Sequence, residues 1–262
     1  SITNITIETS TLCNARCIIC PNNTVVRDIY NTPLDDFKRT IQSFPNLKEM
    51  SLCGMYEPLA DKRLPEIFDI IKNVDPNIKI TIFTNGSLLY KWDNLLLKNL
   101  SSIIFSIHAF RKDTYNTIMK GLDRDKVYQN IINFCEKRKS TVPKTSVSFV
   151  RTSLNINELS DFITFWKQYV DNVTNYELMN WNSTVNNYKN LLDRPKTKVR
   201  ACPMFDQPLV IDAYGNIVRC CYNFKFNYGN VRKDGINKWL SKTKTSNIYP
   251  DTDCFKCDGW RV

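Results

Sequence analysis

Six short apolar segments alternate with amphipathic stretches over roughly the first 180 residues, and this alternation restricts the fold more than any other feature. Most of the short segments are rich in Ile, Val and Phe and are flanked by turn residues, which is typical of strands. We predict strands at Ile5–Glu8, Glu49–Cys53, Ile78–Phe83, Ser102–Ile107, Thr145–Val150 and Tyr176–Met179. The spacing of apolar residues predicts helices at Leu34–Phe44, Pro65–Asn73, Leu88–Leu97, Asp125–Lys139 and Ile156–Val170. Strands that alternate with helices predict an α/β fold with a parallel sheet and right-handed crossovers, although periodicity alone does not separate an open sheet from a barrel.

The composition is that of a globular chain, with 42% hydrophobic and 24% charged residues. The sequence holds no apolar run of about 18 residues and begins without the features of a secretory signal, so we expect no membrane association and a cytoplasmic location. Neither GxGxxG nor a GxxxxGKS/T loop occurs, which removes the usual signatures of nicotinamide enzymes and P-loop NTPases. Lys and Arg number 36 against 26 Asp and Glu. No basic run with interleaved aromatic residues stands out, and we therefore expect no nucleic acid partner.

The chain has ten cysteines, an unusual number for a protein in a reducing compartment. In that setting, clustered cysteines usually bind metal or take part in catalysis rather than form disulfides. Three of them lie in Cys13-Asn-Ala-Arg-Cys17-Ile-Ile-Cys20, directly after the first predicted strand. Three thiolates on one loop can hold three corners of a four-iron cluster and leave the fourth iron open to a ligand.

A second group of cysteines lies towards the C-terminus. Its members are Cys202, Cys220, Cys254 and Cys257. Two short strands, Leu209–Asp212 and Asn216–Arg219, are predicted to form a hairpin in the same region. Four thiolates without an open position fit a closed [4Fe–4S] cluster, and a zinc ion would satisfy the same ligands. Zinc shared between Cys17, Cys20 and the terminal CxxC pair is a further alternative.

The CxxxCxxC motif after the first strand of a βα array resembles the radical S-adenosylmethionine (SAM) superfamily. The resemblance implies a partial (β/α)6 barrel with its site at the C-terminal ends of the strands, and a [4Fe–4S] cluster on Cys13, Cys17 and Cys20. It also implies that SAM binds the open iron through its amino and carboxylate groups. In that family an electron, delivered by a donor such as flavodoxin or ferredoxin, cleaves SAM, and the 5′-deoxyadenosyl radical abstracts a hydrogen atom from the substrate.

Residues at the ends of the later strands resemble the SAM-binding motifs of this family. Gly54-Met55-Tyr56-Glu57-Pro58 resembles the GGEP segment that meets the SAM amino group, with Met55 and Tyr56 where glycines are usual. Thr84-Asn85-Gly86 resembles the TNG turn. The SAM-contacting residues that the resemblance implies are Gly54, Glu57, Thr84, Asn85, Ser106, His108, Arg151 and Asn180. Each also has a plain structural alternative, such as a turn, a hydrogen-bonded barrel residue or a solvated charge.

The C-terminal region resembles the twitch appendage, a shortened SPASM region, of radical SAM enzymes. Gly229-Asn230-Val231, followed by a predicted helix around Trp239, contributes to this resemblance, which is to the twitch-type dehydrogenase family of aminoglycoside biosynthesis, 2-deoxy-scyllo-inosamine dehydrogenase. We predict a barrel over residues 1–182, a linker over 183–201 and an auxiliary-cluster region over 202–262. Two [4Fe–4S] clusters and SAM are then the expected cofactors.

Three functions are consistent with these features. The first is a radical SAM enzyme that oxidises a small polar molecule, such as a sugar, cyclitol or nucleotide, with help from the second cluster. The second is an epimerase or peptide-modifying enzyme in which the thiol of Cys221 returns a hydrogen atom to the substrate radical. The third is a non-catalytic zinc or iron–sulfur binding module.

Overall fold

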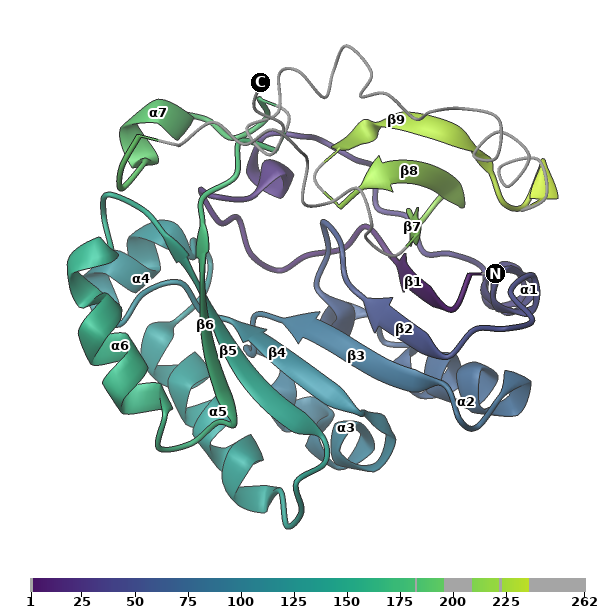
Figure 1. Cartoon of the computed structure of the whole chain (residues 1–262), viewed down its shortest axis with the longest axis horizontal. Helices are drawn as coiled ribbons and strands as arrows, with labels where there is room; N and C mark the ends of the chain where they lie inside the picture. The colour runs from purple at the N-terminus through teal and green to yellow at the C-terminus, as the bar shows by residue number, and fades with distance from the viewer. Residues whose placement is uncertain (1, 182, 196–208, 222, 236–262) are drawn as a thin grey trace.

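The computed structural model describes residues 2–181, 183–195, 209–221 and 223–235. Its strands are β1 (Asn4–Ile7), β2 (Glu49–Leu52), β3 (Lys79–Thr84), β4 (Ser102–Ser106), β5 (Lys144–Arg151), β6 (Asn172–Glu177), β7 (Leu209–Ile211), β8 (Asn216–Cys220) and β9 (Asn223–Asn230). They form one sheet in the order β6-β5-β4-β3-β2-β1-β7-β8-β9 (Figure 1). Pairing is parallel from β6 to β7 and antiparallel between β7, β8 and β9. The α/β fold with a parallel sheet is therefore confirmed.

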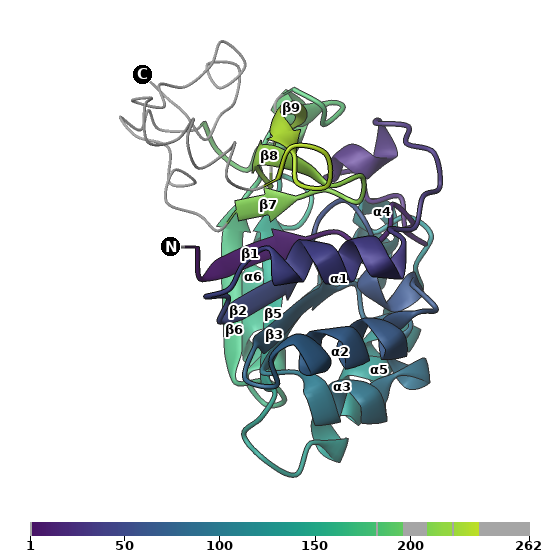
Figure 2. The same ribbon diagram turned by 90° about the vertical axis from the view of Figure 1, so that its right-hand side faces the viewer.

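Seven α-helices are described, and most of them lie on one side of this sheet. They are α1 (Leu34–Gln42), α2 (Leu64–Val74), α3 (Asp93–Asn99), α4 (Lys112–Ile118), α5 (Arg124–Lys137), α6 (Leu159–Trp166) and α7 (Tyr188–Leu191), with the 3-10 turns η1 (Pro21–Asn23), η2 (Pro58–Ala60), η3 (Leu89–Lys91) and η4 (Ile156–Glu158). Figure 2 shows α1, α2, α3 and α5 on one side of the sheet, while the face turned towards the viewer in Figure 1 carries none of these helices. None of the described helices has the length and apolar composition needed to cross a lipid bilayer.

Helix α5 illustrates how the sequence builds this layer. Asp123 caps its first turn by accepting hydrogen bonds from the amides of Asp125 and Lys126. Its apolar residues fall on one face and are buried. One of them, Phe134, packs edge to face against Phe105 of β4, with ring centroids 5.8 Å apart.

The strands alternate between the two faces of the sheet. In β4, Ile103 and Phe105 point to the helices and are completely buried, whereas Ser102, Ile104 and Ser106 lie on the other face and are half-buried. The face that packs against the helices is thus entirely apolar in this strand, whereas the other face carries two serines and one isoleucine.

Several elements differ from the sequence-based prediction. The sixth strand runs over Asn172–Glu177 instead of Tyr176–Met179, because it is a polar outer strand that pairs with β5 through its backbone and carries little apolar signal. Helix α4 was not predicted, since only Tyr115 and Ile118 of its seven residues are buried. Periodicity cannot be detected in so short an apolar face.

The predicted C-terminal hairpin is present, and it extends the sheet. β7 pairs in parallel with β1 and antiparallel with β8, and Gly215 turns the chain between them with a φ of +85°. The strand β9 was not predicted. The predicted helix at Ile236–Lys242 lies outside the described residues, and the domain boundaries stay a prediction.

Candidate functional site

The loop of residues 13–20 runs along the C-terminal end of α4. The amide of Arg16 donates to the carbonyl of Lys120 at 2.8 Å, and the amide of Ile18 donates to the carbonyl of Ile118 at 2.9 Å. These bonds fix a loop that has no regular structure of its own. A helix that the sequence did not reveal therefore positions the cysteine motif.

The three thiols of this loop are half-buried and form no disulfide. Burial raises the pKa of Cys13 and of Cys17, and it raises the pKa of Cys20 to about 12. The negative charge of the neighbouring thiolates raises the pKa of Cys17 and Cys20 further. Three such thiols ionise together only beside a bound cationic centre, because the ligands of a metal must lose their protons. The donor set thus fits an iron–sulfur cluster.

A zinc ion and a four-iron cluster need different spacings of the three thiolates. Among the described residues, no three Cys, His, Asp or Glu side chains lie close enough together to hold one metal ion. Thiolates around one zinc ion, each about 2.3 Å from it, lie within about 4 Å of one another. In a four-iron cluster each cysteine binds a different iron, so wider spacing is required.

Glu57 joins the GGEP-like segment to the turn after β3. Its Oε1 accepts hydrogen bonds from Thr84 Oγ1 at 2.6 Å and from the Leu59 amide at 3.0 Å, and its Oε2 accepts from the Asn85 amide at 2.8 Å. Burial raises the pKa of this carboxyl to about 7. The structure brings three of the predicted residues together here, and their mutual contacts tie two loops to each other.

Asn14 extends this connection to the cysteine loop. Its side-chain carbonyl accepts from Asn85 Nδ2 at 2.9 Å, and its Nδ2 donates to Ser87 Oγ at 2.9 Å. We did not single out Asn14 from the sequence, although its position beside Cys13 was a usable signal. The cysteine loop, the GGEP-like segment and the TNG turn are therefore linked by side-chain hydrogen bonds.

Gly54 leaves room for a carboxylate that the sequence analysis also missed. A Cβ at position 54 would lie 2.3 Å from Oε1 of Glu8, which follows β1 and is completely buried. Glu8 forms an ion pair with Arg27 at 2.7 Å. The φ of Gly54 is +159°, at the edge of the range that residues with side chains rarely adopt, so both the space and the backbone conformation favour glycine here.

His108 ties the end of β4 to β5. Its Nδ1 accepts from the Val150 amide at 3.2 Å and lies 3.1 Å from the Ser148 carbonyl, while its own carbonyl accepts from Asn155 Nδ2 at 2.6 Å. Burial lowers the pKa of His108 to about 4, so the ring is neutral at pH 7. These contacts match the structural alternative of a hydrogen-bonded barrel residue. Ser106 lies beside Ser148 in the register of β4 and β5.

Arg151 lies in a separate ionic network. Its guanidinium contacts Asp193 Oδ2 at 3.2 Å and Glu177 Oε1 at 3.3 Å, at the outer strand β6. The structure does not link it to the cysteine loop by any hydrogen bond or ion pair among the described residues.

Asn180 is buried in the turn after β6, and its carbonyl accepts from the Thr184 amide at 3.1 Å. The Thr184 carbonyl in turn accepts from Thr24 Oγ1 at 2.5 Å. This bond brings the Asn180 turn to the segment that follows the cysteines.

The second group of cysteines is described only in part. Cys220 ends β8, Cys221 follows it, and both are half-buried without a disulfide. Cys202, Cys254 and Cys257 lie outside the described residues. The second cluster therefore stays a prediction.

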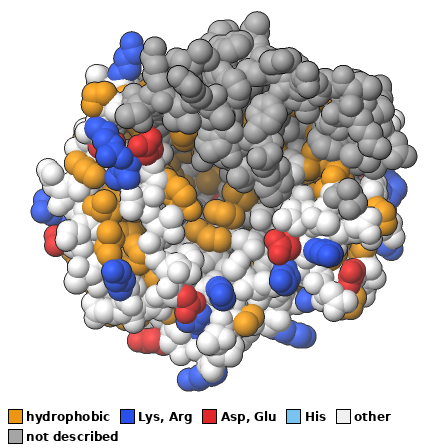
Figure 3. Space-filling view, in the orientation of Figure 1, with side chains coloured by type: hydrophobic (Ala, Val, Ile, Leu, Met, Phe, Trp, Pro, Cys, Tyr) orange, Lys and Arg blue, Asp and Glu red, His pale blue; other side chains and the backbone are white. Residues whose placement is uncertain are grey.

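Hydroxyl groups line the face of the sheet that carries no helices. Neighbouring strands place Ser and Thr residues opposite one another in two rows: Thr6, Ser51, Thr81 and Ser102 from β1 to β4, and Ser106, Ser148 and Thr174 from β4 to β6. Thr81 Oγ1 and Ser102 Oγ lie 2.7 Å apart. In Figure 3 hydrophobic side chains lie at the visible centre of this face, and charged side chains lie around them.

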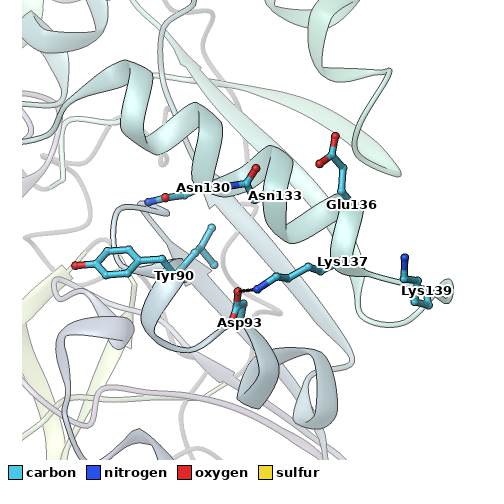
Figure 4. A pocket seen from close by; sticks show the side chains of 8 residues that line it. Tyr90, Asp93, Asn130, Asn133, Glu136, Lys137 and Lys139 are labelled. Carbon is cyan, nitrogen blue, oxygen red and sulfur yellow. Dashed lines mark hydrogen bonds and ion pairs between the residues drawn. The ribbon is translucent and has the colours of Figure 1, made fainter.

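A pocket of about 500 Å³ lies elsewhere, in the outer helical layer (Figure 4). It is built by η3, α3 and α5, and its lining includes Tyr90, Asn130 and the ion pair of Lys137 with Asp93. It is not formed by the ends of the strands. The sequence analysis did not indicate this pocket.

Comparison with known proteins gives matches in sequence and in structure. Residues 7–165 match the family described as the Radical SAM superfamily. A GTP 3′,8-cyclase of Clostridium botulinum is 26% identical over 176 residues, which cover 64% of this chain and 53% of that protein. The chain spans about half the length of the curated relatives it matches.

Two solved proteins show the likeness in fold. Streptococcus suis SuiB, solved with S-adenosylmethionine and with the precursor peptide SuiA, is 16% identical and superposes with TM-scores of 0.73 and 0.70, over 98% of this chain and 70% of SuiB. BtrN in complex with AdoMet and 2-DOIA is 17% identical and has a TM-score of 0.62, over 93% of this chain and 86% of BtrN. At this identity the structural comparisons establish the fold and nothing finer.

Proposed function

The chain belongs to the radical SAM superfamily, and from this membership we propose that it reductively cleaves SAM and abstracts a hydrogen atom from a small polar substrate. Cys13, Cys17 and Cys20 would hold the [4Fe–4S] cluster that the family binds. The bound cluster and SAM would supply the electron and the 5′-deoxyadenosyl radical. An acidic one-electron carrier such as flavodoxin or ferredoxin is the proposed electron donor.

The protein's own residues would order the loops around that centre. Asn14, Glu57 and Asn85 connect the cysteine loop, the GGEP-like segment and the TNG turn through hydrogen bonds of 2.8 to 2.9 Å. Glu57 is buried and occupied by these contacts, so its proposed role is to hold the loops in place rather than to react. A fixed arrangement lowers the cost of aligning two reacting groups.

The observation that carries the choice of substrate is the hydroxyl-lined face of the sheet. Ser148 is only 6% exposed, yet its hydroxyl forms no hydrogen bond with the described residues, and Ser106 and Thr174 lie beside it in the register. These hydroxyls are not among the fully buried polar atoms of the described residues, so a ligand with hydroxyl groups can bond to them in place of water. A sugar, a cyclitol or the ribose of a nucleotide has matching hydroxyl groups. The relatives named GTP 3′,8-cyclase add support for a nucleotide.

We further propose that Cys202, Cys220, Cys254 and Cys257 hold a second [4Fe–4S] cluster. Bound there, the cluster would accept an electron from the substrate radical, and the net reaction would be an oxidation. In the second candidate function Cys221, next to Cys220 at the end of β8, gives a hydrogen atom to the substrate radical instead. The likeness to SuiB, which has been solved with a precursor peptide, supports a peptide substrate for that candidate.

The experiment uses anaerobically prepared protein with its clusters reconstituted. With dithionite and SAM, the wild type should form 5′-deoxyadenosine and methionine and should contain about eight irons per chain for two clusters. The matched control replaces Cys13, Cys17 and Cys20 by Ala, which should abolish SAM cleavage and leave about four irons. Absence of 5′-deoxyadenosine from the fully loaded wild type would refute the function. Loss of nearly all iron in the control would refute two separate clusters.

A second experiment separates the two reaction types. Candidate substrates, GTP and a peptide among them, are scored by their stimulation of 5′-deoxyadenosine formation. The product made in D2O should then carry no solvent deuterium at the abstraction carbon, and Cys221→Ala should retain turnover. Incorporation of one deuterium by the wild type, with loss of product in Cys221→Ala, would identify Cys221 as the hydrogen donor.

A further inference from the structure

Glu8 is a buried carboxylate for which the proposed function gives no role. It follows β1 and has no exposed surface. Its Oε1 accepts a hydrogen bond from the Met55 amide at 2.6 Å. Its Oε2 accepts from Arg27 Nη1 at 2.7 Å and from the Ala213 amide at 3.3 Å. One carboxylate therefore contacts the GGEP-like segment, the segment after the cysteines and the turn between β7 and β8.

Arg27 completes the arrangement from the other side. Its Nη2 donates to the Met55 carbonyl at 2.6 Å and to Glu8 Oε1 at 3.3 Å. Its side chain is only 12% exposed, so the pair is largely shielded from solvent. Hydrogen bonds to ionised groups are short and strong, and here two of them bind the same residue. Both backbone polar groups of Met55 are thus held by one ion pair.

Met55 stands where the GGEP pattern has a glycine. The backbone carbonyls of the residues on either side of it are left for a ligand. The carbonyls of Gly54 and Tyr56 accept no hydrogen bond from any described residue, although Tyr56 is buried and Gly54 is half-buried. Unpaired carbonyls at this depth favour a ligand that donates to them, such as an ammonium group. Their direction depends on Met55, which lies between them.

We propose that the Glu8–Arg27 ion pair is a positioning element that fixes Met55, so that the carbonyls of Gly54 and Tyr56 receive the amino group of SAM. Through the Ala213 amide the same pair links this segment to the C-terminal hairpin. The inference rests on the proposed binding of SAM and assigns residues outside the cysteine motif to it.

The test compares SAM binding by cluster-loaded Glu8→Gln and Arg27→Gln with that of the wild type. Each variant should bind SAM about tenfold more weakly, which corresponds to about 1.4 kcal/mol. The double variant should bind SAM about as weakly as the weaker-binding single variant, since both changes remove the same interaction. The SAM-induced change in the electron paramagnetic resonance spectrum of the reduced cluster should be altered as well, and a merely structural role would not move that signal.

Asp61→Asn is the matched control. Asp61 is also buried at this end of the sheet and forms an ion pair with Arg63 at 2.8 Å, but it bonds to Thr9 and not to residues 54–57. This control should lose stability and keep the SAM dissociation constant. Arg27→Lys serves as a milder variant, because it keeps the charge beside Glu8 and lacks the second arm that reaches Met55.

Two results would overturn the inference. One is a loss of SAM affinity in Asp61→Asn that is as large as the loss in the Glu8 and Arg27 variants. The other is a lowered melting temperature in the Glu8 and Arg27 variants, the milder Arg27→Lys included, with an unchanged dissociation constant. A wild type that binds no SAM at all would instead refute the proposed function.

Discussion

Replacing Gly54 by Ala tests the close packing around the Glu8 carboxylate. The added Cβ would lie 2.3 Å from Glu8 Oε1 and 2.4 Å from its Cγ, and these are distances that real Cβ atoms do not adopt. Glu8 is completely buried and cannot swing into solvent. It must therefore move away from the Met55 amide, with which it forms a hydrogen bond of 2.6 Å.

The expected cost follows from two contributions. Forcing one extra carbon into a packed interior costs about 1–3 kcal/mol. Weakening a hydrogen bond to a charged, buried acceptor costs about 1.5–3 kcal/mol more. We therefore expect Gly54→Ala to lower the free energy of unfolding by about 2.5–6 kcal/mol.

Chemical denaturation of four proteins measures the effect. These are the wild type, Gly54→Ala, Glu8→Ala and the double variant. If the collision with Glu8 is the main cause, the methyl group should cost clearly less in the Glu8→Ala background, where the space is free. Equal costs in both backgrounds would show that the glycine is required for another reason.

Two further predictions concern residues whose SAM contacts the resemblance implies. His108 is the only histidine, so nuclear magnetic resonance of its labelled ring should show one titration near pH 4 instead of 6.5. Because the pKa of His108 is lowered in the folded state, that state binds fewer protons than the unfolded one. The neutral ring therefore contributes about 3 kcal/mol to stability, which should be lost as the pH falls from about 6.5 to 4. A ring titration with its midpoint between pH 6 and 7 would contradict the buried placement. Arg151→Ala should destabilise the protein by about 2 kcal/mol through loss of its contacts with Glu177 and Asp193. It should leave the SAM dissociation constant unchanged, and a tenfold weaker affinity would instead support contact with the SAM carboxylate.

Much of the fold was predictable from local sequence patterns. The strands β1 to β5 lie within one or two residues of their predicted positions, because most of them are short runs rich in Ile, Val and Phe with turn residues nearby. The sixth strand was displaced and α4 was missed, because the first is polar and the second buries only two side chains. Both segments are stabilised by contacts with a neighbouring element, and such contacts cannot be read from the segment's own sequence.

The candidate site was predictable as a set of motifs and not as a set of contacts. The grouping of Glu57, Thr84 and Asn85 followed from their positions at the ends of neighbouring parallel strands, where residues distant in sequence converge. Nothing in the sequence indicated that Arg151 would pair with Asp193, 42 residues further along the chain. Such a contact depends on how the outer strand and the following turn come together.

The sequence by itself determined the parallel α/β architecture and the cysteine motif, because short apolar runs and short spacings are local properties. The tertiary structure alone decided which polar groups form hydrogen bonds and ion pairs with one another. Glu8 has no signal in the sequence, yet folding encloses it between Arg27, Met55 and Ala213, from segments up to 205 residues away. A buried charge must find its partners wherever the chain brings them, and that requirement becomes visible only once the sheet and its loops are assembled.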